Sequence, residues 1–169
     1  MNIDTITLQE EETRSPGLSA DEQVKRLRQL AATWLQENRY QKAIEIYEKA
    51  LVVAEATSPV LQETAAEICH ELGKLHFDQG HRREASKHYK KALTFYETIH
   101  PSKRHKDVAS SYFIMGRFFE QIWKVDLARQ HYGESHRLMG IVLGEDHPHV
   151  KAIGMQLERF EKNVAPFAK

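Results

Sequence analysis

The sequence has few of the residues that build disulfides, thiolate metal centres or membrane spans. Its 169 residues include a single cysteine, Cys69, which excludes an internal disulfide and a four-thiolate zinc site. No run of 18 apolar residues occurs, so no membrane span is predicted. The first residues, MNIDTITLQEEETR, have neither a basic start nor an apolar core, so no secretory signal is expected. A soluble, cytoplasmic protein without membrane association is therefore predicted.

An excess of charge is missing too. Lysine and arginine together number 24, and so do aspartate and glutamate. Duplex nucleic-acid binders usually have a basic surplus, so no nucleic-acid partner is expected. The charge is unevenly placed, because the first 20 residues contain four carboxylates and one arginine. Residues 1–18, which are polar and end near Ser15-Pro16-Gly17, are predicted to be a disordered acidic tail.

The sequence does contain a threefold internal repeat. Segments 30–51, 72–93 and 115–136 align without gaps, at spacings of 42 and 43 residues. A small residue recurs at one position and a tyrosine four residues later, as Ala43, Ala85 and Ala128 and as Tyr47, Tyr89 and Tyr132. We expect two helices to approach closely at each alanine, and each tyrosine to fill the space between repeats. The pattern predicts an all-α solenoid, because a single repeat cannot bury its apolar face alone.

Apolar periodicity and turn residues locate the individual helices. They are predicted at about 20–37, 40–56, 61–79, 82–98, 105–122, 125–142 and 148–163. The repeats then span about 20–58, 59–100 and 101–146, and the whole domain spans 19–164. Ser19 and Glu22 form a capping box, and Pro148 suits the first turn of the last helix. That helix, 148–163, has Glu158 where the second and third repeats have Gly73 and Gly116, which is typical of a polar terminal cap.

These positions resemble a known family. The small–aromatic–small spacing is similar to the tetratricopeptide repeat (TPR), whose usual period is about 34 residues. The longer period here, together with LGEDHPHV (143–150), resembles the repeats of kinesin light chain, in which a longer helix pair ends in a Leu-Gly-x-x-His-Pro-x-Val turn. The resemblance covers about residues 22–162. It implies a right-handed solenoid of antiparallel helix pairs, with three repeats and a C-terminal capping helix, that binds other proteins or peptides.

The resemblance also implies a binding groove, lined by the first helix of each pair. In this family the groove residues lie at fixed numbers of residues, or offsets, before and after the small residue of each first helix. These offsets select Arg28, His70, Lys74, Phe77, Phe113, Arg117, Glu120 and Arg159, with Ala32, Leu35, Met155 and Lys162 at the remaining positions. Lys74 and Arg117 have the same offset in the first helices of the second and third repeats, and Arg159 has it in the capping helix. We call these three residues the basic ladder. The ladder favours a partner peptide that is acidic and has apolar anchors for Phe77 and Phe113.

More specific family functions are not expected. Kinesin light chains carry an Asn-Asn pair where this chain has Arg28-Gln29, His70-Glu71 and Phe113-Ile114. TPR clamps for chaperone tails need a set of basic residues and asparagines, of which only Arg28 is present; Ala32, Glu71, Ser110 and Ile114 depart from it. A general adaptor or scaffold is therefore predicted. Two alternatives stay open, namely a structural subunit that assembles through its outer face and an autonomous domain of a larger TPR protein.

No enzymatic chemistry and no cofactor are predicted. Ten histidines are present, but no HExxH or CxxC motif, and His70 and His76 lie on different faces of one helix. A metal site is therefore not expected. Cys69 occupies a core position of the repeat, which favours a buried thiol over a nucleophile. Trp123 lies in a helix-pair turn, where packing against a neighbouring turn or the last helix is the preferred interpretation and an exposed contact surface is the alternative.

Overall fold

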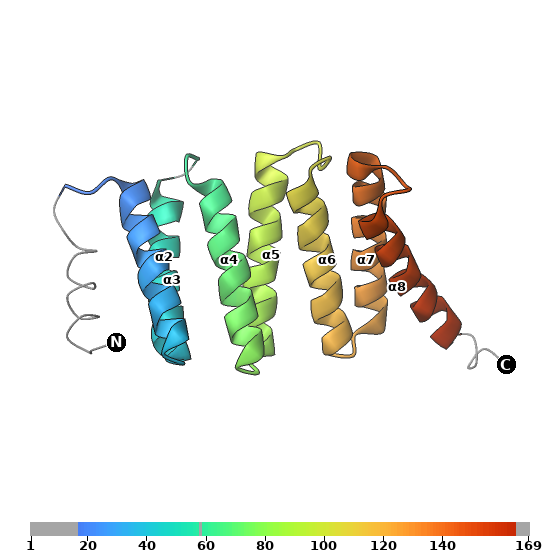
Figure 1. The fold of residues 1–169 in the computed structure, drawn as a ribbon, viewed down its shortest axis with the longest axis horizontal. Coiled ribbons are helices and arrows are strands. Elements are labelled where there is room, and N and C mark those ends of the chain that lie inside the picture. Colours follow the sequence, from blue (N-terminus) through green and yellow to red (C-terminus); the bar gives the residue numbers. More distant parts are fainter. Residues whose placement is uncertain (1–16, 58, 165–169) are drawn as a thin grey trace. The chain divides into compact units, whose positions relative to one another are not determined.

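The fold consists of helices. The computed structural model describes residues 17–57 and 59–164, with side chains as far as residue 160. Its helices are α2 (Ala20–Gln36), α3 (Tyr40–Ala56), α4 (Gln62–Asp78), α5 (Arg82–Ile99), α6 (Lys106–Gln121), α7 (Val125–Leu143) and α8 (Pro148–Val164) (Figure 1). Each begins and ends within one residue of its predicted bounds, and no strand occurs in the described ranges. The predicted all-helical fold is confirmed. The predicted acidic tail falls, up to residue 16, outside the described residues.

The chain divides into two compact units, Met1–His88 and Tyr89–Lys169, with the division inside α5. In unit 1, α2 packs along α3, and α4 packs on α3. In unit 2, α6 packs along α7, and α8 packs on α7. No described helix combines the length and the apolar character that a bilayer span needs. The predicted limits of the domain and of its repeats stay predictions.

Local signals in the sequence fix where the helices begin. The Ser19 hydroxyl accepts a hydrogen bond from the Glu22 backbone N–H, and the Glu22 carboxylate accepts one from the Ser19 N–H, which confirms the capping box before α2. α8 begins at Pro148, as predicted. His147 Nδ1 accepts a hydrogen bond of 3.2 Å from the His149 N–H, so this histidine has a local role at the start of the helix.

The turns within the three helix pairs share one backbone conformation. Asn38, Gly80 and Trp123 occupy equivalent positions, with φ of 57°, 79° and 62°. Glycine and asparagine adopt this left-handed conformation readily, whereas a bulky residue is strained there. Trp123 is also 85% exposed. The preferred interpretation of Trp123, packing against a neighbouring turn or α8, is therefore wrong, because the turn directs its side chain into solvent.

The core of unit 1 follows the repeat pattern. Ala43 is fully buried, as is Ala31 on α2, and Tyr47 one turn after Ala43 is buried as well. Ala85, the equivalent position on α5, is also fully buried. Cys69 has no exposed surface, which confirms the predicted buried thiol. Small residues therefore occupy the buried positions that the repeat pattern assigned to them.

The core of unit 2 is built around Tyr132. A Cβ atom added to Gly116 on α6 would lie 2.7 Å from Tyr132 Cδ1, so the absence of a side chain at this glycine lets the ring pack on the α6 backbone. The Tyr132 ring also stacks at 5.8 Å on Phe160 of α8, as expected for a residue between repeats. The buried Ser135 hydroxyl donates a hydrogen bond of 2.8 Å to the Ala109 carbonyl, which joins α7 to α6. These contacts give unit 2 a tightly packed interior next to its pocket.

Candidate functional site

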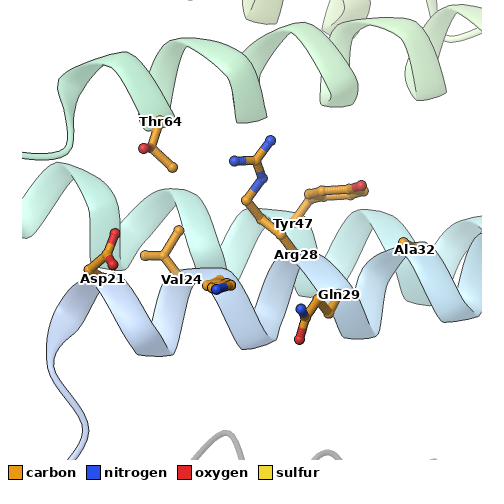
Figure 2. Close-up of a pocket in the computed structure, with 8 residues that line it drawn as sticks. Asp21, Val24, Arg28, Gln29, Ala32, Tyr47 and Thr64 are labelled. Carbon is orange, nitrogen blue, oxygen red and sulfur yellow. The ribbon is translucent and has the colours of Figure 1, made fainter.

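Unit 1 has a pocket of about 530 Å³ between the first helices of its two helix pairs. Its lining comes mostly from α2, with one residue from α3 and one from α4: Asp21, Val24, Lys25, Arg28, Gln29, Ala32, Tyr47 and Thr64. Figure 2 shows the Arg28 side chain extending from α2 toward α4, between Thr64 and Tyr47. The volume lies within the range of ordinary ligand pockets.

The charges in this pocket are largely balanced. Arg28 Nη1 lies 2.9 Å from Glu67 Oε2 of α4, and both side chains are partly exposed. An ion pair of this kind contributes at most about 1 kcal/mol to stability, yet it occupies the guanidinium. The remaining charged lining residues, Asp21 and Lys25, have opposite signs. This pocket therefore has no strong preference for an anionic ligand.

Unit 2 has a smaller pocket of about 200 Å³, which α6, α7 and α8 form together. Its lining residues are Phe113, Arg117, Glu120, Tyr132, His149, Ala152, Ile153 and Gln156. The Phe113 ring lies 5.5 Å from the Tyr132 ring and 5.8 Å from the His149 ring. A volume of this size suits individual side chains of a peptide better than a whole small molecule.

The acidic residue of this pocket, Glu120, is held by two neighbours. The Tyr132 hydroxyl donates a hydrogen bond of 2.8 Å to Glu120 Oε2, and Gln156 Nε2 donates one of 2.7 Å to Glu120 Oε1. Burial and this contact with a carboxylate both raise the pKa of the Tyr132 hydroxyl, so it keeps its proton and remains a donor at neutral pH. Arg159 Nη1 in turn donates a hydrogen bond of 2.9 Å to Gln156 Oε1. Glu120 is thus part of the pocket framework.

Arg117 is the basic residue of this pocket, and it is exposed. It forms no ion pair with any residue in the described part of the chain, and the carboxylate of the pocket lining, Glu120, already accepts two hydrogen bonds. Arg117 and Arg159 both lie close enough to Tyr132 to lower its pKa, which opposes the larger effect of burial. The outer part of this pocket is consequently electropositive.

The two pockets are built on equivalent repeat positions. Tyr47 and Tyr132 share one register position, and each tyrosine comes from the second helix of its pair. The same register relates Arg28 to Phe113, Ala32 to Arg117 and Thr64 to His149. The fold therefore makes the same kind of pocket in each unit, and the side chains at these positions give each pocket its own chemistry.

The structure brings some of the predicted site residues together. Phe113, Arg117 and Glu120 line the unit 2 pocket, with Arg159 hydrogen-bonded to its edge. Arg28 lines the unit 1 pocket. His70, Lys74 and Phe77 of α4 line neither pocket; Lys74 is exposed, and the other two are half-buried. The basic ladder stays a prediction, because Lys74 belongs to unit 1 and the other two residues to unit 2.

Several lining residues were not expected from the sequence. Tyr47 and Tyr132 were assigned to the space between repeats, yet each also lines a pocket. On α8 the pocket is lined by His149, Ala152, Ile153 and Gln156, whereas the repeat offsets had selected Met155, Arg159 and Lys162. Lys162 lies beyond the described side chains. A prediction that included the first turn of each first helix, together with the repeated tyrosine of the second helix, would have found most of these lining residues.

Two groups of side chains bring potential metal ligands together, and the sequence-based prediction of no metal site stays a prediction. The first comprises Glu48, His76 and His88, and the second comprises His100, His105 and Asp107. The sequence interpretation had compared His76 only with His70 on the same helix, and the structure instead brings His76 close to residues of two other helices.

Comparisons with known proteins agree with this fold. Residues 22–98 match the sequence profile of the tetratricopeptide repeat family. A search of curated proteins finds no significant sequence match. Among solved structures, the chain is similar to BtubC (BKLC) from P. vanneervenii, with 20% identity and a TM-score of 0.74 over 95% of this chain and 65% of that one.

Two further solved structures have a similar fold. Kinesin light chain-like, nearly identical TPR-like repeats from Podosopora anserina align at 18% identity and a TM-score of 0.62, over 81% of this chain and 64% of that one. The Rap conjugation gene regulator of the plasmid pLS20, solved in complex with the Phr* peptide, aligns at 14% identity and a TM-score of 0.57, over 91% of this chain and 48% of that one. The chain thus spans less than two thirds of each of these three structures. The sequence profile thus shows tetratricopeptide repeats over residues 22–98, and the similarity to these solved structures shows that the chain has a TPR-like fold.

Proposed function

We propose that this chain is a protein-binding scaffold, and that the unit 2 pocket binds a peptide segment with an acidic residue next to an apolar one. The observation that carries the proposal is the pairing of Arg117, exposed and without an ion pair in the described ranges, with the half-buried ring of Phe113. A peptide carboxylate would meet Arg117, and an apolar side chain would contact Phe113 and Ile153. The same segment in the unit 1 pocket would meet Arg28, whose guanidinium is already paired.

The two kinds of contact would contribute differently to binding. The exposed guanidinium of Arg117 would mainly accelerate encounter and fix the register of the peptide, and salt would weaken its effect. Aromatic contacts with Phe113 would slow dissociation, because they remove apolar surface from water. The fold is compatible with this use: the similar Rap regulator was solved in complex with a peptide.

A selection experiment with random peptides tests the proposal. Peptides displayed on phage would be selected on the wild-type protein alone, and the affinity of each enriched peptide would then be measured for the wild type and for Arg117→Glu, a change at an exposed position that should leave the fold intact. We expect the enriched peptides to carry an acidic residue beside an apolar one. Enriched peptides that bind the wild type and Arg117→Glu with equal affinity would refute the proposal.

A matched control comes from the other pocket. Ala32→Glu introduces the same carboxylate at the register position equivalent to Arg117, and Ala32 is likewise exposed. This variant should bind the selected peptides as the wild type does. If Ala32→Glu alone abolishes binding, the unit 1 pocket is the binding site and the assignment is wrong.

Assembly through Trp123 is a second candidate function. An 85% exposed tryptophan in a strained turn is an unusual feature for a surface without a partner. Tryptophan is enriched among the residues that dominate protein interfaces. Light scattering after size exclusion would test this candidate: a defined oligomer that dissociates in Trp123→Asn would support it, and a monomeric wild type at high concentration would remove self-assembly.

A further inference from the structure

Three helices of unit 1 bring potential metal ligands together. Glu48 is on α3, His76 is near the end of α4, and His88 is on α5. One ligand atom from each residue lies within 4.8 Å of the others. All three residues belong to the same compact unit.

The two histidines form a stacked pair. Their ring centroids lie 5.2 Å apart, with an angle of 11° between the ring planes. His76 is buried, and its Nδ1 atom has no hydrogen-bond partner in the described part of the chain. Buried polar atoms in folded proteins usually have a partner, so His76 Nδ1 is available to bind a ligand.

The same stack occurs one repeat further along the chain, without the ligands. There Phe119 stands at the position of His76, and its ring stacks on His131 at 5.1 Å and 15°. Lys90 occupies the register position of Glu48 and is close enough to His131 to lower its pKa. The stacked rings therefore do not need a second histidine, nor a carboxylate, for packing. Unit 1 differs at two positions, and each difference adds a metal ligand.

We propose that Glu48, His76 and His88 bind one divalent transition-metal ion, with Zn²⁺ as the best-suited ion. Two imidazoles and one carboxylate are ligands that zinc accepts, and water would complete a tetrahedral site. Two donors at zinc distances of about 2.0–2.1 Å lie roughly 3.4 Å apart on a tetrahedral ion, so modest side-chain rotation closes the site. Glu48 is exposed and His88 is half-buried, so solvent gives the ion access.

The environment favours the form of histidine that a metal needs. Burial lowers the pKa of His76, which keeps its imidazole neutral at pH 7, and the nearby Glu48 carboxylate acts in the opposite direction with a smaller effect. The ion would join α3, α4 and α5 across two helix pairs. Binding would therefore stabilise unit 1 rather than create a catalytic centre, and it is independent of the peptide pocket in unit 2.

The second ligand group is a weaker candidate. His105 Nδ1 already accepts a hydrogen bond of 3.4 Å from the Asp107 N–H as the N-cap of α6, and it lies 3.2 Å from the Asp107 carboxylate. Its ring stacks at 3.6 Å on His100. A local helix cap explains this group, so it supplies a control.

Zinc titration of the full chain tests the proposal. Binding would be measured by isothermal calorimetry in competition with a weak chelator, so that scattered surface histidines do not contribute. The variants His76→Phe and Glu48→Lys install the residues found at Phe119 and Lys90, where the chain itself accommodates them. We expect one equivalent of Zn²⁺ on the wild type, an affinity at least about tenfold lower in each variant, and a zinc-dependent rise of the wild-type melting temperature that both variants lose.

The control variant is His105→Asn, which keeps an N-cap residue and removes a ligand of the second group. It should bind zinc as the wild type does. Circular dichroism at 222 nm would confirm that each variant is folded, and Co²⁺ in place of Zn²⁺ would report the ligand geometry through its visible absorption. The absence of a saturable site, an affinity unchanged in both His76→Phe and Glu48→Lys, or a loss confined to His105→Asn would each overturn the proposal.

Discussion

Gly116 offers a sharp test of how unit 2 is packed. Glycine inside a helix usually costs stability, so Gly116→Ala should gain about 1 kcal/mol from helix propensity alone. The added Cβ, however, would lie 2.7, 2.9 and 2.9 Å from Cδ1, Cε1 and Cγ of Tyr132. The ring cannot easily retreat, because it is 1% exposed, its hydroxyl donates to Glu120, and the Phe160 ring stacks on it.

Overpacking of this kind typically costs about 1–3 kcal/mol, and three atoms of a confined ring indicate the upper part of that range. Gly116→Ala should therefore lower the free energy of unfolding by about 2 kcal/mol after the gain in propensity. The melting temperature should fall by about 4–8 °C for a chain of this size.

Gly133→Ala is the matched control. Gly133 also lies within a helix, α7, but a Cβ there would meet nothing within 4 Å. This variant should gain up to about 1 kcal/mol, and the difference between the two variants isolates the contact with Tyr132. Urea unfolding followed at 222 nm would measure both. Equal stability of the two variants, or a stabilised Gly116→Ala, would show that α6 and Tyr132 do not pack as described.

Three further predictions concern other positions. Ala85→Leu should lower the free energy of unfolding by about 1–3 kcal/mol, because Ala85 is fully buried; an unchanged melting temperature would count against this burial. Trp123→Asn should raise stability by about 1 kcal/mol, since asparagine tolerates the left-handed turn, as at Asn38; a thermal melt that shows a loss would mean that the indole has stabilising contacts. Burial, with a smaller effect from Lys90, lowers the pKa of His131 in the folded protein. On acidification the unfolded state therefore takes up this proton before the folded state does, and the free energy of unfolding should decrease as the pH falls below about 6.5. In His131→Phe this part of the pH dependence should disappear from urea midpoints measured between pH 5 and 8, and an unaltered profile would refute it.

The helices could be predicted closely because the repeat pattern encodes them three times over. The alanines and tyrosines that recur in register indicated which helix faces pack together, and Ser19 and Pro148 indicated where two helices begin. All observed helix bounds agree with the predicted ones within one residue. Signals of this kind act within a few residues along the chain, so a single sequence is enough to find them.

The pocket was predicted only in part, because it depends on contacts between helices. Phe113, Arg117 and Glu120 followed from their offsets, but the offsets do not show that Tyr132 and Gln156 hold the Glu120 carboxylate. The ligand group of Glu48, His76 and His88 was missed for the same reason, since its members come from three helices that approach one another only in the fold.

The central claim is that Phe113 and Arg117 form a binding site for acidic, apolar peptides. Its most direct measurement is the affinity of a selected peptide for the wild type, Arg117→Ala and Phe113→Ala, by fluorescence anisotropy at low and high salt. Arg117→Ala should weaken binding mainly at low salt. Phe113→Ala, if circular dichroism shows that it is folded, should weaken the free energy of binding by about 2 kcal/mol at both salt concentrations. Folded variants that bind the peptide as tightly as the wild type at both salt concentrations would contradict the claim.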